Sequence, residues 1–151
     1  MIIGIIREGK TPPDKRVPLT PQQCLEVQNK FKCQVVVQPS PIRAYSDKEY
    51  SDLGLTLSED MSQCDVLMGV KEVPKQDLLP NKKYFFFSHT YKKQSYNRDL
   101  LQEVIAKSIQ LVDYEMLTDT NGIRVVAFGR YAGIVGAYNG LRGYGLKTGR
   151  C

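Results

Sequence analysis

The apolar positions form short runs separated by amphipathic stretches, which predicts alternating strands and helices. Residues 2–6 are apolar except for Gly4 and show no polar alternation, as in a strand buried on both faces of a parallel sheet. Further strands are predicted at 34–38, 66–70, 83–88 and 109–112. Repeated β–α units of this kind predict an α/β, Rossmann-like three-layer domain with a mainly parallel sheet and helices on both faces.

Capping signals mark where the helices begin. Thr20 is followed by a proline and, three residues later, by Gln23, which predicts a helix over 21–31. Ser46 and Glu49 form a second capping box that opens a short helix. Apolar periodicity predicts a helix over 97–108, and a long helix is predicted over 130–146. Glycines at 133, 136 and 140 in the long helix predict a face packed closely against another backbone.

Composition narrows the class of protein. The 151 residues suit one domain, and the net charge of +5 favours anionic partners. No long basic run is present, so we expect small anionic ligands and no nucleic acid. No apolar run approaches the roughly 20 residues that span a bilayer, so we expect no membrane association and a cytoplasmic location. Four cysteines without a Cys-x-x-Cys pair, and a single histidine, predict reduced thiols and no metal site.

Polar residues that could take part in catalysis or ligand binding follow the predicted strands. In open parallel sheets, ligands bind beyond the carboxyl ends of the strands. One histidine, three acids and two lysines follow the apolar runs of the predicted strands, and one arginine lies in the loop after the first strand. These residues are Arg16, Lys71, Glu72, His89, Lys92, Asp113 and Glu115. If the strands are parallel neighbours, this edge predicts a proton-transfer site for an anionic substrate.

Each of these residues also has a simpler interpretation. Lysines at strand ends are usually solvated, which is the simpler interpretation of Lys71, and a histidine after three phenylalanines, such as His89, is more often half-buried and bonded to backbone. The glutamates fit ordinary surface carboxylates, and Arg16 can pair with Asp14. The sequence pattern alone leaves these alternatives open.

Four motifs in order resemble the N-terminal domain of the alanine dehydrogenase and pyridine nucleotide transhydrogenase superfamily. They occupy 15–21 (KRVPLTP), 69–74 (GVKEVP), 87–92 (FSHTYK) and 125–133 (VVAFGRYAG). The His-x-x-Lys continuation, the Asp-Tyr-Glu segment and the Arg-Val-Val-Ala-Phe-Gly segment are most similar to lysine-forming saccharopine dehydrogenase and the lysine-ketoglutarate reductase domain. The resemblance spans nearly the whole chain.

The resemblance implies an oxidoreductase that acts on saccharopine, or on lysine plus 2-oxoglutarate. It implies that Lys71 and His89 are the acid/base pair that moves protons during imine formation or hydrolysis. It further implies that Glu72 and Glu115 tune their charge state. By the same carry-over, substrate carboxylates are held by three cations, Arg16, Lys92 and Arg124.

The resemblance also implies a nicotinamide cofactor, NAD or NADP, bound by a second domain. We expect residues 1–151 to form the substrate-binding, acid/base domain, without the dinucleotide-binding domain and without hydride transfer by this chain alone. The glycines at 143, 145 and 149 lack the strand before them and the helix after them that a dinucleotide loop needs. The expected partners are the substrate, a dinucleotide-binding domain or subunit, and a second copy bound through the apolar helix.

Two alternatives remain at this stage. An alanine dehydrogenase-type enzyme would take a small monocarboxylate rather than a ligand with two or more carboxylates. A non-catalytic module that binds an amino acid or an oxo acid would bind ligand without turnover.

Overall fold

The computed structural model describes residues 1–150 and divides into two compact units. The first unit comprises Met1–Met116, and the second begins at Leu117. Each unit is described by itself below.

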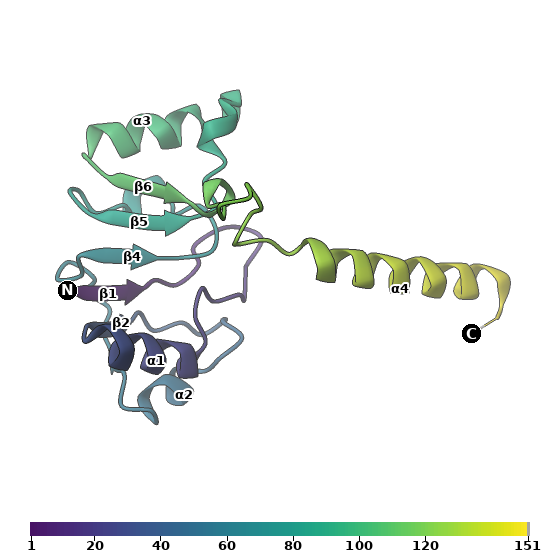
Figure 1. Ribbon diagram of the computed structural model, residues 1–151, viewed down its shortest axis with the longest axis horizontal. Coiled ribbons are helices and arrows are strands. Elements are labelled where there is room, and N and C mark those ends of the chain that lie inside the picture. Colours follow the sequence, from purple (N-terminus) through teal and green to yellow (C-terminus); the bar gives the residue numbers. More distant parts are fainter. Residues whose placement is uncertain (151) are drawn as a thin grey trace. The chain divides into compact units, whose positions relative to one another are not determined.

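The first unit is built on a six-stranded sheet in which every neighbouring pair is parallel. The strand order is β3-β2-β1-β4-β5-β6, so the direction of winding reverses between β1 and β4. The carboxyl ends of the strands share one edge of the sheet (Figure 1). The strands are β1 Ile2–Ile5, β2 Gln34–Val37, β3 Thr56–Leu57, β4 Val66–Met68, β5 Lys83–Phe86 and β6 Gln110–Asp113.

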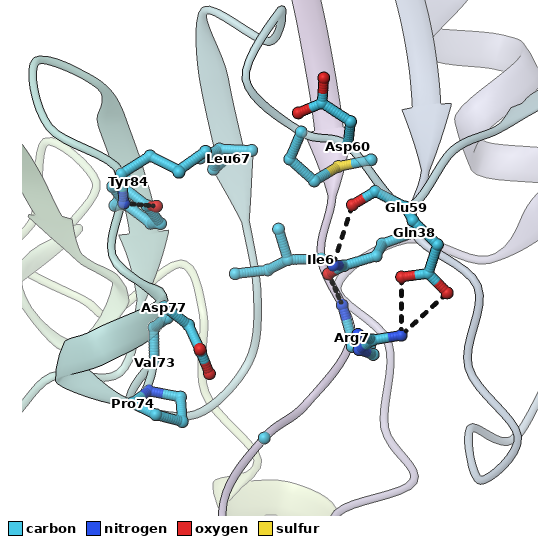
Figure 2. A pocket seen from close by; sticks show the side chains of 13 residues that line it. Ile6, Arg7, Gln38, Glu59, Asp60, Leu67, Val73, Pro74, Asp77 and Tyr84 are labelled. Atoms are coloured by element: carbon cyan, nitrogen blue, oxygen red, sulfur yellow. Dashed lines mark hydrogen bonds and ion pairs between the residues drawn. The ribbon is translucent and has the colours of Figure 1, made fainter.

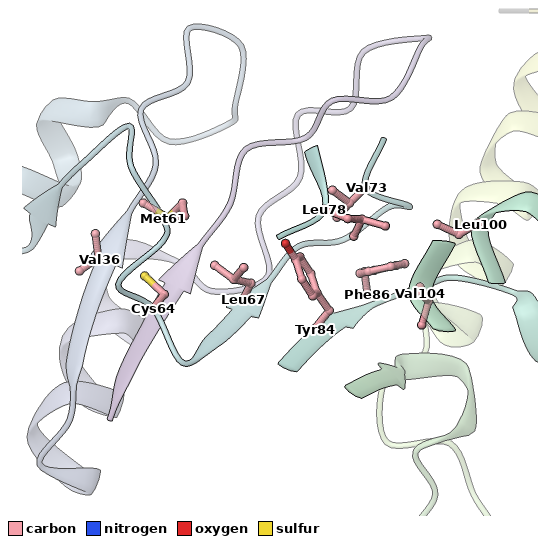
Figure 3. Packing of buried hydrophobic residues seen from close by; sticks show 10 residues of the cluster. All are labelled: Val36, Met61, Cys64, Leu67, Val73, Leu78, Tyr84, Phe86, Leu100 and Val104. Atoms are coloured by element: carbon pink, nitrogen blue, oxygen red, sulfur yellow. The ribbon is translucent and has the colours of Figure 1, made fainter. Parts of the chain in front are cut away.

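Helices cover both faces of this sheet, as predicted. Val35 and Val36 are consecutive on β2 and point to opposite faces. Val35 belongs to a core with residues of α1 (Pro21–Phe31) and α2 (Asp47–Ser51). Val36 belongs to the other core, to which α3 (Arg98–Ala106) contributes Leu100 and Val104 (Figure 3). The predicted α/β three-layer architecture is therefore confirmed.

Local sequence determines where the first two helices begin. The Thr20 hydroxyl accepts a hydrogen bond from the Gln23 amide, and the Gln23 side chain accepts one from the Thr20 amide. Ser46 and Glu49 make the same reciprocal pair at α2. Both predicted capping boxes are confirmed. They fix where α1 begins between β1 and β2 along the chain, and where α2 begins between β2 and β3.

The structure differs from the predicted elements in three places. The strand β4 ends at Met68 and β5 at Phe86, two residues earlier than predicted, because the chain turns before the polar residues of the edge. The two-residue strand β3 was not predicted, since it is too short to carry a hydrophobic pattern. The helix predicted over 97–108 is shorter in the structure, where α3 covers Arg98–Ala106 and follows a 3-10 turn over Ser95–Asn97.

The second unit consists of a turn and one long helix. Thr118 and Arg124 form an isolated antiparallel bridge, and α4 covers Gly129–Thr148. Several large apolar side chains of this segment are exposed; they are Phe128, Tyr131, Ile134, Val135, Tyr138, Leu141, Tyr144 and Leu146. A Cβ added at Gly133, Gly136 or Gly140 would meet nothing within 4 Å inside this unit, and the close packing of these glycines against another backbone stays a prediction.

Three features of the described part of the chain bear on its expected surroundings and ligands. No helix within residues 1–150 is long and apolar enough to cross a membrane. The same residues contain no group of three or more His, Cys, Asp or Glu side chains that could hold a metal ion. Cys24, Cys33 and Cys64 are free and buried, and burial raises the pKa of the Cys24 thiol to about 11. Cys151 lies outside the described residues.

Candidate functional site

The end of β6 carries a buried carboxylate that organises the edge of the sheet. Asp113 is 7% exposed and accepts a hydrogen bond from the Ser88 hydroxyl at 2.7 Å. It also accepts from the backbone amides of His89 at 2.8 Å and Glu115 at 2.9 Å. Asp113 therefore ties the segment after β5 to the segment after β6.

This network holds His89 in an unusual backbone conformation. The residue has φ 56° and ψ 10°, in the left-handed region that non-glycine residues seldom adopt. Its amide is held by Asp113, and its carbonyl oxygen accepts a hydrogen bond from the Asn97 side chain at 3.3 Å. The surrounding structure thus fixes the direction in which the imidazole leaves the backbone.

The His89 ring contacts a buried acid. Its Nδ1 lies 2.7 Å from Oε2 of Glu115, which is 8% exposed. The same oxygen lies 3.0 Å from Nζ of Lys92, so one carboxylate joins the two candidate groups. Phe87 stacks on the imidazole with ring centroids 6.3 Å apart. The contact at Nδ1 leaves Nε2 as the ring nitrogen that can exchange a proton with a ligand.

Arg16, in the loop after β1, is paired with Asp14. Its Nε lies 3.0 Å and its Nη2 2.6 Å from the two carboxylate oxygens. This pairing was one of the sequence-based alternatives, and it is confirmed. A guanidinium carries five N–H donors, so the pair leaves donors of Arg16 for a further carboxylate. Arg16 is 57% exposed at its side chain, which makes those donors accessible.

The Asp14–Arg16 pair predicts a measurable acid titration. The hydrogen bonds from Arg16 lower the pKa of Asp14 to about 2, below its ordinary value of 3.8. A lowered carboxyl pKa adds stability above the ordinary value, and this stability is lost as the pH falls toward 2. We expect Arg16→Gln to return the Asp14 pKa toward 3.8, as measured by carbon NMR of the carboxyl group. An Asp14 titration that stays near 2 in the variant would contradict this pairing.

Glu72 forms a salt bridge with Lys10. Its Oε2 lies 2.5 Å from Nζ of Lys10, and its side chain is 14% exposed. The predicted role in tuning Lys71 therefore competes with a salt bridge to the loop after β1. That same loop supplies Glu8, whose carboxylate accepts hydrogen bonds from the backbone amides of Val70 and Lys71.

Tyr114 places a polar atom in an apolar setting at this edge. Its ring lies against Phe87 and Phe85, with centroids 5.2 and 6.3 Å away. Its hydroxyl is buried and has no hydrogen-bond partner among residues 1–150. Burial, followed by the nearby charge of Glu8, raises the Tyr114 pKa. Tyr114 thus lies within electrostatic reach of the segment that carries Lys71.

We expect Tyr114→Phe to leave the free energy of unfolding unchanged or to raise it by about 1 kcal/mol. The variant removes a desolvated hydroxyl and keeps the aromatic packing. The matched control is Tyr50→Phe, because the buried Tyr50 hydroxyl donates to the Leu19 carbonyl oxygen at 3.1 Å. We expect the control to lose about 1 kcal/mol. Equal losses in the two urea-unfolding series would show that Tyr114 has a partner.

The predicted site residues fall into two groups at one sheet edge. Arg16, Lys71 and Glu72 follow β1 and β4, and the charges of Arg16 and Lys71 both act on Asp14. His89, Lys92 and Glu115 follow β5 and β6 and are in direct contact. Because β1, β4, β5 and β6 are successive parallel neighbours, the two groups lie along a single edge. Arg124 belongs to the second unit.

Sequence reasoning missed some of the residues that build this edge. Glu8 lies three residues beyond the end of β1, so the rule that found the other residues after strand ends applies to it as well. Asp113 was recognised at a strand end without a role, and its three hydrogen bonds supply one. Nothing in the local pattern marks the contact of Lys10 with Glu72.

A separate cavity of about 280 Å³ lies on the face of the sheet that carries Leu67 and Tyr84 (Figure 2). Its wall includes Glu59, Asp60 and Asp77, and Glu59 pairs with Arg7 at 2.9 Å. Every predicted site residue is missing from the lining of this cavity. Its chemistry is therefore distinct from that of the strand-end residues.

Comparison with known proteins identifies relatives of this chain. A protein 43% identical over 146 residues is the mitochondrial alpha-aminoadipic semialdehyde synthase of Bos taurus; the match covers 97% of this chain and 16% of that protein. The L-lysine-forming, NAD(+) saccharopine dehydrogenase of Yarrowia lipolytica is 33% identical, over 94% of this chain and 40% of that protein. The chain thus spans less than half of either relative.

Solved structures show the same fold. A transhydrogenase from Sinorhizobium meliloti matches with a TM-score of 0.67 and 17% identity, over 80% of this chain and 37% of that chain. The family model described as the N-terminal domain of alanine dehydrogenase/PNT matches residues 4–135. This chain therefore belongs to the alanine dehydrogenase/PNT N-terminal domain family.

Proposed function

We propose that this chain is the substrate-binding, acid/base domain of an oxidoreductase that acts on the CH–NH bond of saccharopine. The observation that carries the proposal is the contact of His89 and Lys92 with the buried Glu115, beside the strand end that presents Lys71. The names of the relatives, saccharopine dehydrogenase and alpha-aminoadipic semialdehyde synthase, support the same substrate class.

The residues suit proton transfer at a carbon–nitrogen bond. During imine hydrolysis, water adds to the imine carbon, and its proton passes to a base. The carbon–nitrogen bond then breaks, and a proton passes to the departing amine nitrogen. In the proposal, Lys71 and His89 accept and return these protons, and Glu115 fixes the orientation of His89. Acid/base help of this kind is worth about 100- to 10,000-fold in rate.

The proposed substrate carries several carboxylates, and we propose that cations of this chain hold them. Arg16 keeps unused N–H donors beside Asp14, and Lys92 lies at the end of β5 next to His89. Arg124 is proposed as a third carboxylate-binding group. A ligand with two or more carboxylates needs fixed cations, because charge-assisted hydrogen bonds are stronger than neutral ones.

The described residues do not fit a nicotinamide dinucleotide. A dinucleotide loop joins a strand to a helix and is rich in glycine. The segment between β1 and α1 contains a single glycine, Gly9, while Gly143 and Gly145 lie inside α4. We therefore propose that NAD or NADP is bound by another domain or subunit.

A second copy of the chain, bound through α4, is a further proposed partner. The cytoplasmic location stays a prediction, since one relative is named as mitochondrial.

Calorimetric titration of the 151-residue chain tests the substrate class. We expect saccharopine and 2-oxoglutarate to bind more tightly than lysine, and alanine to give no heat of binding. Addition of NADH alone is expected to give no signal. Alanine binding as tightly as saccharopine would favour an alanine dehydrogenase-type substrate. Binding without turnover, even when the dinucleotide-binding domain of a relative is supplied, would favour a non-catalytic module.

A further inference from the structure

Glu8 connects the first strand to the segment that carries Lys71. The residue lies three positions beyond the end of β1 and is half-buried. Its Oε1 accepts a hydrogen bond from the Val70 amide at 2.6 Å, and its Oε2 accepts one from the Lys71 amide at 2.8 Å. Both carboxylate oxygens are thus used to hold two consecutive amides that are more than sixty residues away in sequence.

The close approach of Glu8 depends on Gly69. A Cβ added at Gly69 would lie 3.2 Å from the Ile6 side chain and 3.4 Å from Oε1 of Glu8. A larger residue would press on Ile6 and reach the carboxylate that grips the next two amides. The glycine before Val70 and Lys71 therefore makes room for the contact between the two segments.

Several charges surround this contact. The nearest loop supplies Asp14 and Arg16, which act on Glu8 with opposite sign, and the charge of Lys71 acts on Asp14. On the other segment, Glu72 is paired with Lys10. Burial of Glu8 raises its pKa, and the two amide hydrogen bonds oppose that rise. The two donors match an ionised carboxylate, which accepts at both oxygens.

We propose that Glu8 is a positioning residue for Lys71, because it fixes the backbone of Val70 and Lys71 and places a negative charge at the base of the lysine. This inference rests on the proposed function, in which Lys71 exchanges protons with the substrate. The carboxylate would set the direction in which the lysine side chain leaves the backbone.

The test is Glu8→Gln, which keeps the shape of the side chain and removes its charge. The amide oxygen of the glutamine can accept a hydrogen bond from one of the two backbone N–H groups. The NH₂ group of the glutamine is itself a donor, so it cannot accept a hydrogen bond from the other N–H. We expect the profile of Lys71 acylation against pH, followed by mass spectrometry in the ligand-free chain, to move down by about half a pH unit. Acylation of Lys71 at a fixed pH on the rising limb would then increase about threefold. We also expect saccharopine to bind at least about threefold more weakly.

Glu26→Gln is the matched control, since Glu26 lies on the exposed surface of α1. It makes the same chemical change and is expected to leave both readouts unchanged. An acylation profile of Lys71 in Glu8→Gln that coincides with that of the control would overturn the proposal. If Glu8→Gln does not fold, an NMR titration of the unmodified chain tests the proposal. The Val70 and Lys71 amide signals must then follow the NMR titration of the Glu8 carboxyl carbon, and independent titrations would overturn the proposal.

The two readouts separate this inference from the proposed function. The acylation profile needs no ligand, so it measures the coupling of Glu8 to Lys71 directly. A shifted profile in a chain that does not bind saccharopine would refute the proposed function. Saccharopine binding with an unshifted profile would refute the role of Glu8 alone.

Discussion

Asp113→Ala is expected to lower the free energy of unfolding by about 2–5 kcal/mol, measured by urea unfolding at neutral pH. The substitution removes the acceptor of three donors at this edge, namely the Ser88 hydroxyl and the amides of His89 and Glu115. It also releases the left-handed backbone of His89, whose amide Asp113 holds. The effect should therefore be among the largest that a single polar substitution produces in this chain.

Two further variants test the explanation. Asp113→Asn keeps one acceptor oxygen, so we expect a loss between zero and that of Asp113→Ala. Asp52→Ala removes a carboxylate whose salt bridge with Lys48 joins side chains that are 60% and 78% exposed. We expect this control to change the free energy of unfolding by less than about 0.5 kcal/mol. Equal losses for Asp113→Ala and Asp52→Ala would show that the network does not stabilise the fold.

Arg16→Ala is expected to weaken the binding of saccharopine and of 2-oxoglutarate by about 10- to 100-fold. A hydrogen bond to a charged group is worth about 1.5–3 kcal/mol, which corresponds to that range of affinity. Calorimetric titration of the variant measures the change. The loss for lysine, which carries one carboxylate, is expected to be smaller.

Arg7→Ala is the matched control for Arg16→Ala. It removes the same charge, yet Arg7 pairs with Glu59 at the separate cavity. Affinity should be unchanged in this control. If the two variants weaken saccharopine binding equally, the effect comes from net charge, and Arg16 does not contact the ligand.

Much of the fold could be predicted because its signals are local. The bounds of α1 follow from Thr20, Pro21 and Gln23, which interact within one turn of the chain. The parallel sheet follows from apolar runs of β-branched and aromatic residues such as Val35–Val37. The strand β3 could not be predicted, since Thr56 and Leu57 become a strand only through pairing with β2.

The candidate site could be predicted in position but not in its pairings. Strand ends identified Lys71, His89 and Glu115, because parallel strands bring their carboxyl ends to one edge. The partners of these side chains depend on loops that meet in three dimensions. The contact of Glu72 with Lys10 joins residues 62 positions apart, and no periodicity encodes such a contact.

The central claim is that the carboxyl edge of β1, β4, β5 and β6 binds saccharopine. Mapping of amide NMR shifts in the 151-residue chain during a saccharopine titration tests it most directly. The account predicts that the largest shifts occur at residues 14–16, 70–72, 88–92 and 113–115. Shifts confined to the cavity residues Met61, Asp77 and Leu79, or no shifts at saturating saccharopine, would contradict it.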